Sequence, residues 1–151
     1  MVSELLQRLR TQDDLEILRG ELDVLRNAIY QSGTNYSDVL KNEVRGWVSE
    51  IIGRESKDRD IKEYFDEIDK SLSSVPVLAV AISFEPSEKF VEKLSTWLKE
   101  NISKDLVVDI LFNTQLIGGI QLSFRGKYLD LSLRKKIAKE LEAVSLVGSN
   151  K

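Results

Sequence analysis

The chain has no histidine and no cysteine among its 151 residues. The missing cysteines exclude disulfide bonds and thiol chemistry. Without histidine there is also no Ser-His or Cys-His nucleophile pair, no histidine general base and no ordinary zinc site. The catalytic chemistry that remains is limited to carboxylate pairs, Ser-Lys dyads and carboxylate-bound magnesium.

Long apolar runs are missing too, since no stretch approaches the roughly 18 apolar residues of a membrane-spanning helix. The N-terminal residues include acids and lack the apolar core of a signal peptide. A net charge of −3 gives no reason to expect nucleic acid or an anionic membrane as partner. We therefore expect a soluble, intracellular protein that does not insert into a membrane and has no small-molecule substrate.

The acidic pairs Asp13-Asp14 and Asp58/Asp60 are the obvious candidates for carboxylate chemistry. They fall at expected helix starts or in a connector, where acids favour the positive end of the helix dipole. Gly126-Lys127 lacks the flanking glycine and hydroxyl of a phosphate-binding loop. The sequence therefore predicts no catalytic residue, no cofactor-binding residue and no metal ligand.

Residues 1–74 are expected to form a helical bundle or arm of about three helices. In the first helix, five apolar residues recur at spacings of three and four, which is typical of a buried or partner-binding seam: Leu15, Leu18, Leu22, Leu25 and Ile29. Either this seam packs onto the other helices or it is a candidate interface for a partner helix. Ile17 and Val24 lie off the seam, so both interpretations can hold. The pattern predicts a second helix from Ser37 through Ile52 and a third from Asp60 to Leu72.

Residues 75–145 are expected to form a small βαβββα unit with a mixed sheet, followed by a polar tail at 146–151, which makes the whole chain α+β. The runs 77–84 and 106–112 are apolar on both faces and predict strands that are covered on both sides. A helix is expected to begin with Pro86 at its first position. Its buried stripe should contain five residues, with Glu92 and Lys99 facing away: Phe90, Val91, Leu94, Trp97 and Leu98.

The segment Leu116 to Ile137 contains a glycine pair, a hairpin turn and a basic helix in close succession. Gly118 and Gly119 in an apolar strand indicate a bulge or a close backbone approach. Gly126 should supply the positive φ of a two-residue turn. The following helix, expected to end near Ala143, has two possible caps: Asp130 and Ser132.

From Val77 to Leu141 the sequence resembles the C-terminal domain of the delta (OSCP) subunit of F-type ATP synthases. The resemblance is carried by Leu-Ile-Gly-Gly-Ile at 116–120, followed by Asp130, Ser132 and Arg134. Only about 75 residues precede the matching part, where the family usually has a six-helix bundle.

This resemblance implies a non-catalytic subunit of the peripheral stalk, on the cytoplasmic face of the plasma membrane or the matrix or stroma side of an organelle. Its implied partners are the catalytic head, made of alpha and beta subunits, and the b-type stalk helices. The E subunit of V/A-type rotary ATPases is a second family with a helical arm and a Gly-Gly strand. A stand-alone helical adaptor remains an alternative of a different class, and an enzyme using carboxylates or a Ser-Lys pair is a third.

Overall fold

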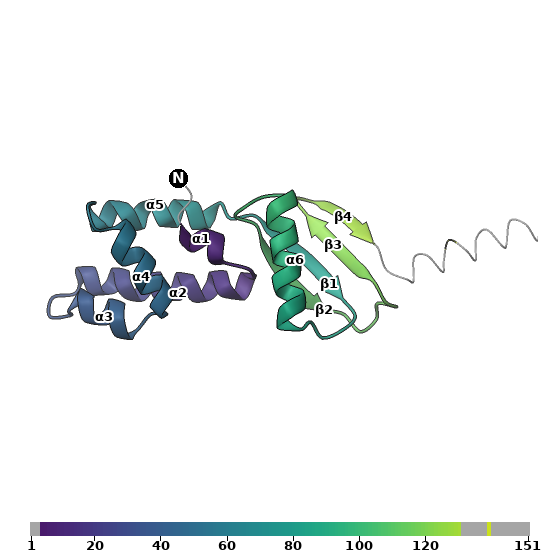
Figure 1. Ribbon diagram of the computed structural model, residues 1–151, viewed down its shortest axis with the longest axis horizontal. Helices are drawn as coiled ribbons and strands as arrows, with labels where there is room; N and C mark the ends of the chain where they lie inside the picture. The colour runs from purple at the N-terminus through teal and green to yellow at the C-terminus, as the bar shows by residue number, and fades with distance from the viewer. Residues whose placement is uncertain (1–3, 131–138, 140–151) are drawn as a thin grey trace, which may run out of the picture.

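The computed structural model describes residues 4–130 and residue 139. Five helices form one end of the molecule, and a four-stranded sheet with one covering helix forms the other (Figure 1). The expected α+β fold is therefore confirmed. The elements are α1 Glu4–Arg8, α2 Gln12–Tyr30, α3 Tyr36–Asn42, α4 Gly46–Glu55, α5 Ile61–Ser73, β1 Val77–Ile82, α6 Glu88–Asn101, β2 Val107–Phe112, β3 Ile120–Phe124 and β4 Lys127–Asp130.

The helical half has five helices where the sequence predicted about three. The predicted second helix is two helices, α3 and α4, because the chain leaves helical geometry at Arg45 (ψ 138°). The backbone N–H of Arg45 donates to Glu21 Oε1 at 2.8 Å instead of to a carbonyl one turn earlier. A separate short helix, α1, precedes α2. The chain changes direction at Thr11, which caps α2 through reciprocal bonds with Asp14.

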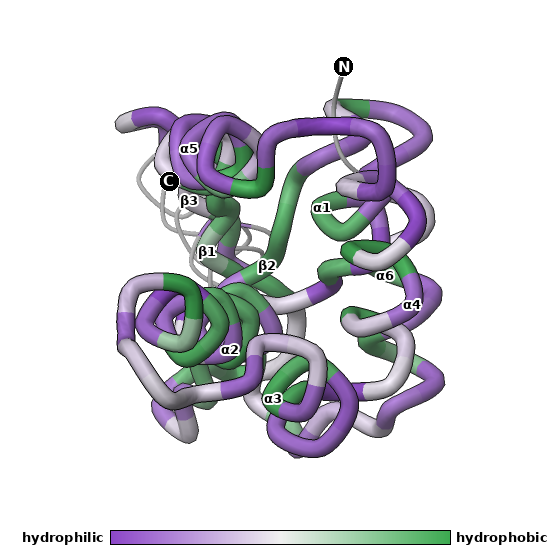
Figure 2. Tube along the Cα trace, turned by 90° about the vertical axis from the view of Figure 1, so that its left-hand side faces the viewer, coloured by the Kyte–Doolittle hydropathy of each residue, from purple (hydrophilic) through white to green (hydrophobic). Residues whose placement is uncertain are grey.

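The core of the helical half is one continuous apolar cluster. Tyr64 and Phe65 on α5 are its largest side chains, and both are 2% exposed. Apolar and polar positions alternate around the helices, as amphipathic packing requires (Figure 2). The predicted third helix is confirmed as α5, where Asp60 caps the first turn by accepting from the N–H groups of Lys62 and Glu63.

The sheet has the strand order β2-β1-β3-β4. β1 runs parallel to β2 and antiparallel to β3, and β3 runs antiparallel to β4, so the expected mixed sheet is confirmed. α6 covers the face that carries Leu78, Val80 and Ile82. The expected last helix, with Ser132 as one of its two candidate caps, lies outside the described residues. Asp130, the other candidate cap, is the last residue of β4.

The expectation that the two apolar strands are covered on both sides is wrong in part. Among residues 4–130, α6 packs on the face of the sheet that carries Leu78, Val80 and Ile82, and Ala79 and Ala81 on the other face of β1 are half-buried. At the end of β2, Leu111 is 50% exposed and Phe112 is 60% exposed. The covering of these strands is therefore incomplete: Val107 and Val108 at the start of β2 are fully buried, whereas the last two residues of β2 are exposed.

Helix α6 also differs from its prediction. Its cap is Ser87, whose hydroxyl accepts from the Phe90 N–H, so the helix begins at Glu88 and not at Pro86. Trp97, expected inside, is 57% exposed. Lys99, expected to face solvent, points toward the helical half. No helix in the described part of the chain is long and apolar enough to cross a membrane.

Candidate partner-binding surfaces

The two halves are joined by backbone pairing at the edge of the sheet. Thr11 forms a parallel bridge with Val108, and the Val108 N–H donates to the Arg10 carbonyl at 3.0 Å. Val107, the first residue of β2, is fully buried in the core of the helical half. The chain just before α2 therefore extends the sheet by one short pairing and ties it to the helices.

Lys99 on α6 strengthens this junction. Its ammonium group donates to the carbonyl of Gln7 at 2.6 Å and also to that of Leu9. Carbonyls at the end of a helix have no partner within the helix, so the lysine satisfies groups that folding leaves unpaired. Burial lowers the pKa of Lys99, and Arg10 acts in the same direction, while Asp14 and Asp105 oppose the shift.

Sequence reasoning missed this contact because Lys99 lies beside a stripe that looked purely apolar. A signal was nevertheless present. Ser95, one turn earlier on the same face of α6, is a small residue, and the structure buries it to 3% exposure. The small Ser95 lets another backbone approach α6 closely, and the long Lys99, four positions later, can then donate to the carbonyls of that backbone.

The seam on α2 is interior. The structure places its four leucines in the helical core at 0–3% exposure: Leu15, Leu18, Leu22 and Leu25. Ile29 is half-buried at the edge of the same core. The seam thus packs onto the other helices, and in this structure its leucines are not at the surface.

The opposite face of α2 is the part of this helix that a partner can reach. Ile17 is 52% exposed and Val24 is 39% exposed, and they lie seven positions apart on one side of the helix. Gly20 lies between them, and a Cβ added there would meet no atom within 4 Å. Together they form a shallow apolar strip with a small residue at its centre.

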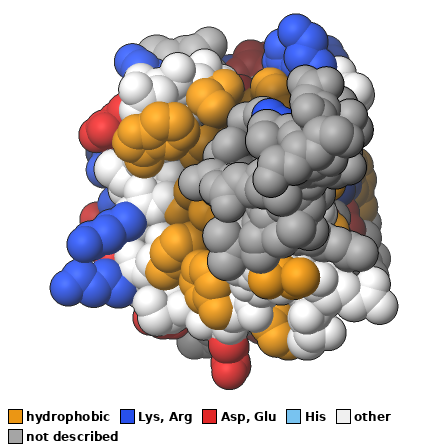
Figure 3. All heavy atoms as spheres, turned by 90° about the vertical axis from the view of Figure 1, so that its right-hand side faces the viewer, with side chains coloured by type: hydrophobic (Ala, Val, Ile, Leu, Met, Phe, Trp, Pro, Cys, Tyr) orange, Lys and Arg blue, Asp and Glu red, His pale blue; other side chains and the backbone are white. Residues whose placement is uncertain are grey.

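The face of the sheet opposite α6 is the second accessible surface. Small side chains form its floor, and Leu111 and Tyr128 flank a hollow of about 290 Å³. Tyr128 is 62% exposed. Hydrophobic side chains gather on this end of the molecule (Figure 3). The floor consists of Ala79, Ala81 and Ser123, with Gln121 beside them.

The glycine pair lies just before β3 and not within a strand. Gly118 has a φ of 66° and Gly119 a φ of 77°, in the connection that leads from β2 into the antiparallel β3. The pair is thus a left-handed turn segment, which glycine adopts without steric cost. At the hairpin, Gly126 (φ 76°) and Arg125 (φ 49°) both have positive φ, as a type I′ turn requires.

Asp130 accepts a hydrogen bond from the Gln121 side chain at 3.3 Å across the β3–β4 pair. The acidic pairs considered from the sequence are not gathered into a site. Asp14 and Asp60 cap helices, and in the described part of the chain no three acidic side chains are placed to hold a metal ion together.

The comparison with known families gives a match to the ATP synthase delta (OSCP) subunit over residues 21–143. No curated protein matches the chain. The match begins within α2, so it extends well beyond the resemblance from Val77 to Leu141 and includes most of the helical half. It covers 123 of 151 residues and favours the delta family over the E-type subunit. The chain therefore belongs to the ATP synthase delta (OSCP) family, as a non-catalytic component of the peripheral stalk of an F-type ATP synthase.

Proposed function

We propose that this subunit ties the catalytic head to the b-type stalk helices, with its helical half (1–74) on the head and its sheet half (75–145) on the stalk. Rotation of the central shaft applies torque to the head, so the head must be held by the stator or it would turn with the shaft. Such a tether needs broad, slowly dissociating contacts instead of a reactive group.

The observation that carries the proposal is the uneven distribution of exposed apolar side chains. Of the eleven large apolar residues that are exposed in the described part of the chain, eight lie in the sheet half. Two of them, Leu111 and Tyr128, flank the same hollow, and apolar side chains gathered at one place on a surface are typical of a site that another protein covers. The eight are Val77, Phe84, Trp97, Ile102, Leu111, Phe112, Ile117 and Tyr128.

The open face of the sheet supports a helical occupant. Small residues at the centre of an interface allow the backbone of a helix to approach closely, and larger residues at the sides restrict its position. Ala79, Ala81 and Ser123 provide such a floor, and Leu111 and Tyr128 stand at its sides. A b-type helix laid across this hollow would bury both of these exposed side chains.

For the head, the accessible strip of Ile17 and Val24 is the better candidate than the buried leucines of the seam. An amphipathic helix of the head would lay its apolar side on this strip, with Gly20 beneath it. The sequence predicted a candidate partner interface on the seam of α2. We propose the opposite face of the same helix in its place.

A pull-down with the b-type helix as bait tests the stalk contact. Ala81→Leu fills the floor of the hollow, and we expect it to weaken capture by about tenfold or more. Tyr30→Ser, which removes an exposed apolar residue of the helical half, is the control and should bind as wild type. Equal binding by Ala81→Leu and wild type, with both folded by circular dichroism, would show that the helix docks elsewhere.

A further inference from the structure

A second hollow, of about 330 Å³, lies on the helical half next to the junction with the sheet half. Three arginines from two segments converge on it, together with Trp47 and with Asp14 as its one acidic residue. This concentration of positive charge is unexpected, because residues 1–75 carry 11 Lys and Arg against 16 Asp and Glu. The arginines are Arg8, Arg10 and Arg45.

Two of these guanidinium groups are held in place against Trp47. Arg45 lies 4.8 Å and Arg8 lies 5.7 Å from the centre of the indole ring. Arg45 also binds Glu21 through its Nε and Nη2 atoms at 2.8–3.0 Å, and Glu21 is only 10% exposed. Arg8 pairs with Glu4 at 3.1 Å. A guanidinium has five N–H donors, so neither arginine is saturated by its one carboxylate.

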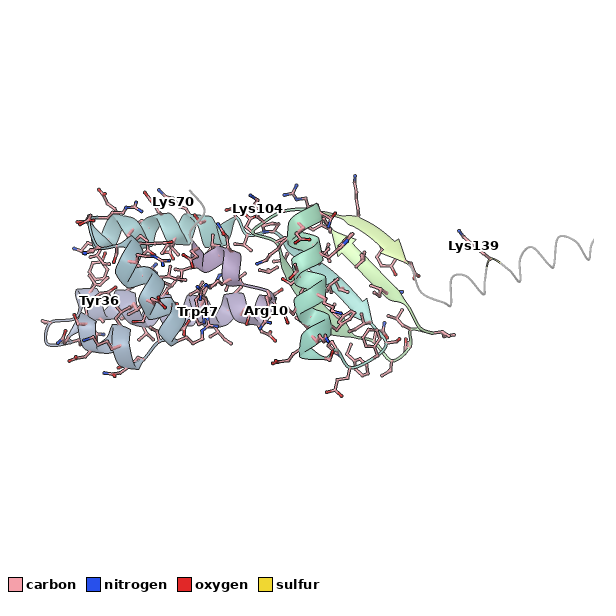
Figure 4. All side chains as sticks on the ribbon, in the orientation of Figure 1. Arg10, Tyr36, Trp47, Lys70, Lys104 and Lys139 are labelled. Carbon is pink, nitrogen blue, oxygen red and sulfur yellow. The ribbon has the colours of Figure 1, made fainter. Side chains whose placement is uncertain are left out.

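Arg10 is different, since its guanidinium has no acidic partner in the part of the chain that the structure describes. Its backbone is nevertheless fixed on both sides. The Arg10 N–H donates to Asp14 Oδ2 at 3.1 Å, and its carbonyl accepts from Val108 N–H at 3.0 Å. Figure 4 shows Arg10 and Trp47 close to the junction of the two halves. The backbone thus anchors an unpaired cation at the hollow.

The single acid in the lining does not cancel this charge fully. Asp14 Oδ2 already accepts from the backbone N–H groups of Arg10 and Thr11, because Asp14 belongs to the capping box of α2. Burial is the largest cause of the lowered pKa of Lys99, and Arg10 lies near enough to lower that pKa further. Glu21 and Glu4 already engage part of the Arg45 and Arg8 guanidinium groups, so an incoming anion would meet its least contested donors on Arg10.

We propose that this hollow binds an aspartate or glutamate side chain carried by a segment of another protein. The hollow is open and partly apolar, with Leu9 and Trp47 in its lining, and it presents side-chain guanidinium groups. Trp and Arg are the residues most often found at the energetic centres of protein interfaces. The carboxylate would lie on Arg10, and the partner's neighbouring methylene groups would lie on Trp47.

The inference deepens the proposed tether, because it gives the chemistry of one contact made beside the junction. Its test uses the full chain and a synthetic peptide of alternating Glu and Ala, with a Gln-Ala peptide of equal length as control. The chain has two tryptophans, so the exposed Trp97 is replaced (Trp97→Phe) and the fluorescence of Trp47 reports on the hollow. Matching melting curves for Trp97→Phe and wild type establish this background.

The Glu-Ala peptide should change the fluorescence of Trp47 in a saturable and salt-sensitive way, and the Gln-Ala peptide should not. Arg10→Gln should raise the peptide Kd about fivefold. Lys70→Gln removes one positive charge from α5, away from the hollow (Figure 4), and should change the Kd by less than about twofold.

Unchanged binding in Arg10→Gln, or an equal loss in Lys70→Gln, would overturn the inference. So would inorganic phosphate that displaces the peptide at equal concentration, because the hollow would then be a general anion site. The b-type pull-down separates this inference from the proposed function. If the peptide fails to bind while the b-type helix is still captured, only the proposed acidic contact is wrong. If the peptide binds while the b-type helix is not captured, only the proposed tether is wrong.

Discussion

The ammonium nitrogen of Lys99 lies 2.6 Å from the carbonyl oxygen of Gln7, so a side chain of α6 in the sheet half holds the end of α1 in the helical half. The same ammonium group also donates to the carbonyl of Leu9. A stalk subunit must transmit force between its two ends. A bond of this kind resists their separation because it is backed by the backbone pairing of Arg10 with Val108.

Lys99→Met keeps the unbranched stem of the side chain and removes the ammonium group with its donors, so the carbonyls of Gln7 and Leu9 lose this partner. We expect the free energy of unfolding to fall by about 1–3 kcal/mol, measured by urea denaturation. Lys93→Met changes an exposed lysine of the same helix and should have an effect within about 0.5 kcal/mol. Similar losses in the two variants would mean that the junction contact contributes little.

Lys99 also predicts a pH dependence. Burial lowers its pKa in the folded protein below the ordinary value of 10.5. Between the two pKa values the unfolded chain binds more protons than the folded one, so the contribution of Lys99 to stability rises with pH in that window. Measured at successive alkaline pH values up to 10.5, the stability of wild type should gain relative to Lys99→Met. A constant difference would refute the shifted pKa.

Gly119 has a φ of 77°, which a branched side chain adopts only under strain. Gly119→Val should therefore destabilise the sheet half or abolish its capture by the b-type helix. Gly119→Ala should cost about 1–2 kcal/mol, because an L-residue resists the left-handed backbone conformation. Thermal unfolding followed by circular dichroism measures both. Normal folding and normal binding of the valine variant would show that the pair does not shape this connection.

Gly20 is the opposite case, a glycine inside a long helix with open space around it. Gly20→Ala should stabilise the protein by about 1 kcal/mol through helix propensity. The same substitution raises the floor of the strip formed by Ile17 and Val24. If this strip is the head contact, the variant should melt at a higher temperature and yet bind the head less tightly. Unaltered head binding would argue against the strip.

Leu18 and Ile17 are neighbours in sequence with opposite environments. Leu18 is fully buried, so Leu18→Ala should cost about 2–5 kcal/mol of stability. Ile17 is 52% exposed, so Ile17→Ala should change stability by less than about 0.5 kcal/mol and act on head binding. Denaturation and co-purification with the head separate the two effects. A large loss of stability in Ile17→Ala would place this residue in the core.

Much of the fold was predictable because local patterns specify it. Apolar spacing indicated α2 and α5, the change near Val75 indicated where the helices give way to the sheet, and Arg125-Gly126 indicated the hairpin. The errors fell where a distant residue intervened. Glu21 captures the N–H of Arg45 and divides one expected helix into two. At the end of β2, Leu111 and Phe112 are exposed although the sequence of the strand is apolar on both faces.

The sequence alone determined the class of protein. It did so through one resemblance: the paired glycines at 118–119, followed by Asp130 and Ser132, are similar to the delta family, and the family match over residues 21–143 shows that membership. Only the tertiary structure decided which apolar residues are interior and which are accessible, and it alone brought Lys99 to Gln7 and three arginines to Trp47. The reason is physical: periodicity gives the direction of a side chain about its own helix or strand, but the neighbour that it meets depends on how distant segments pack.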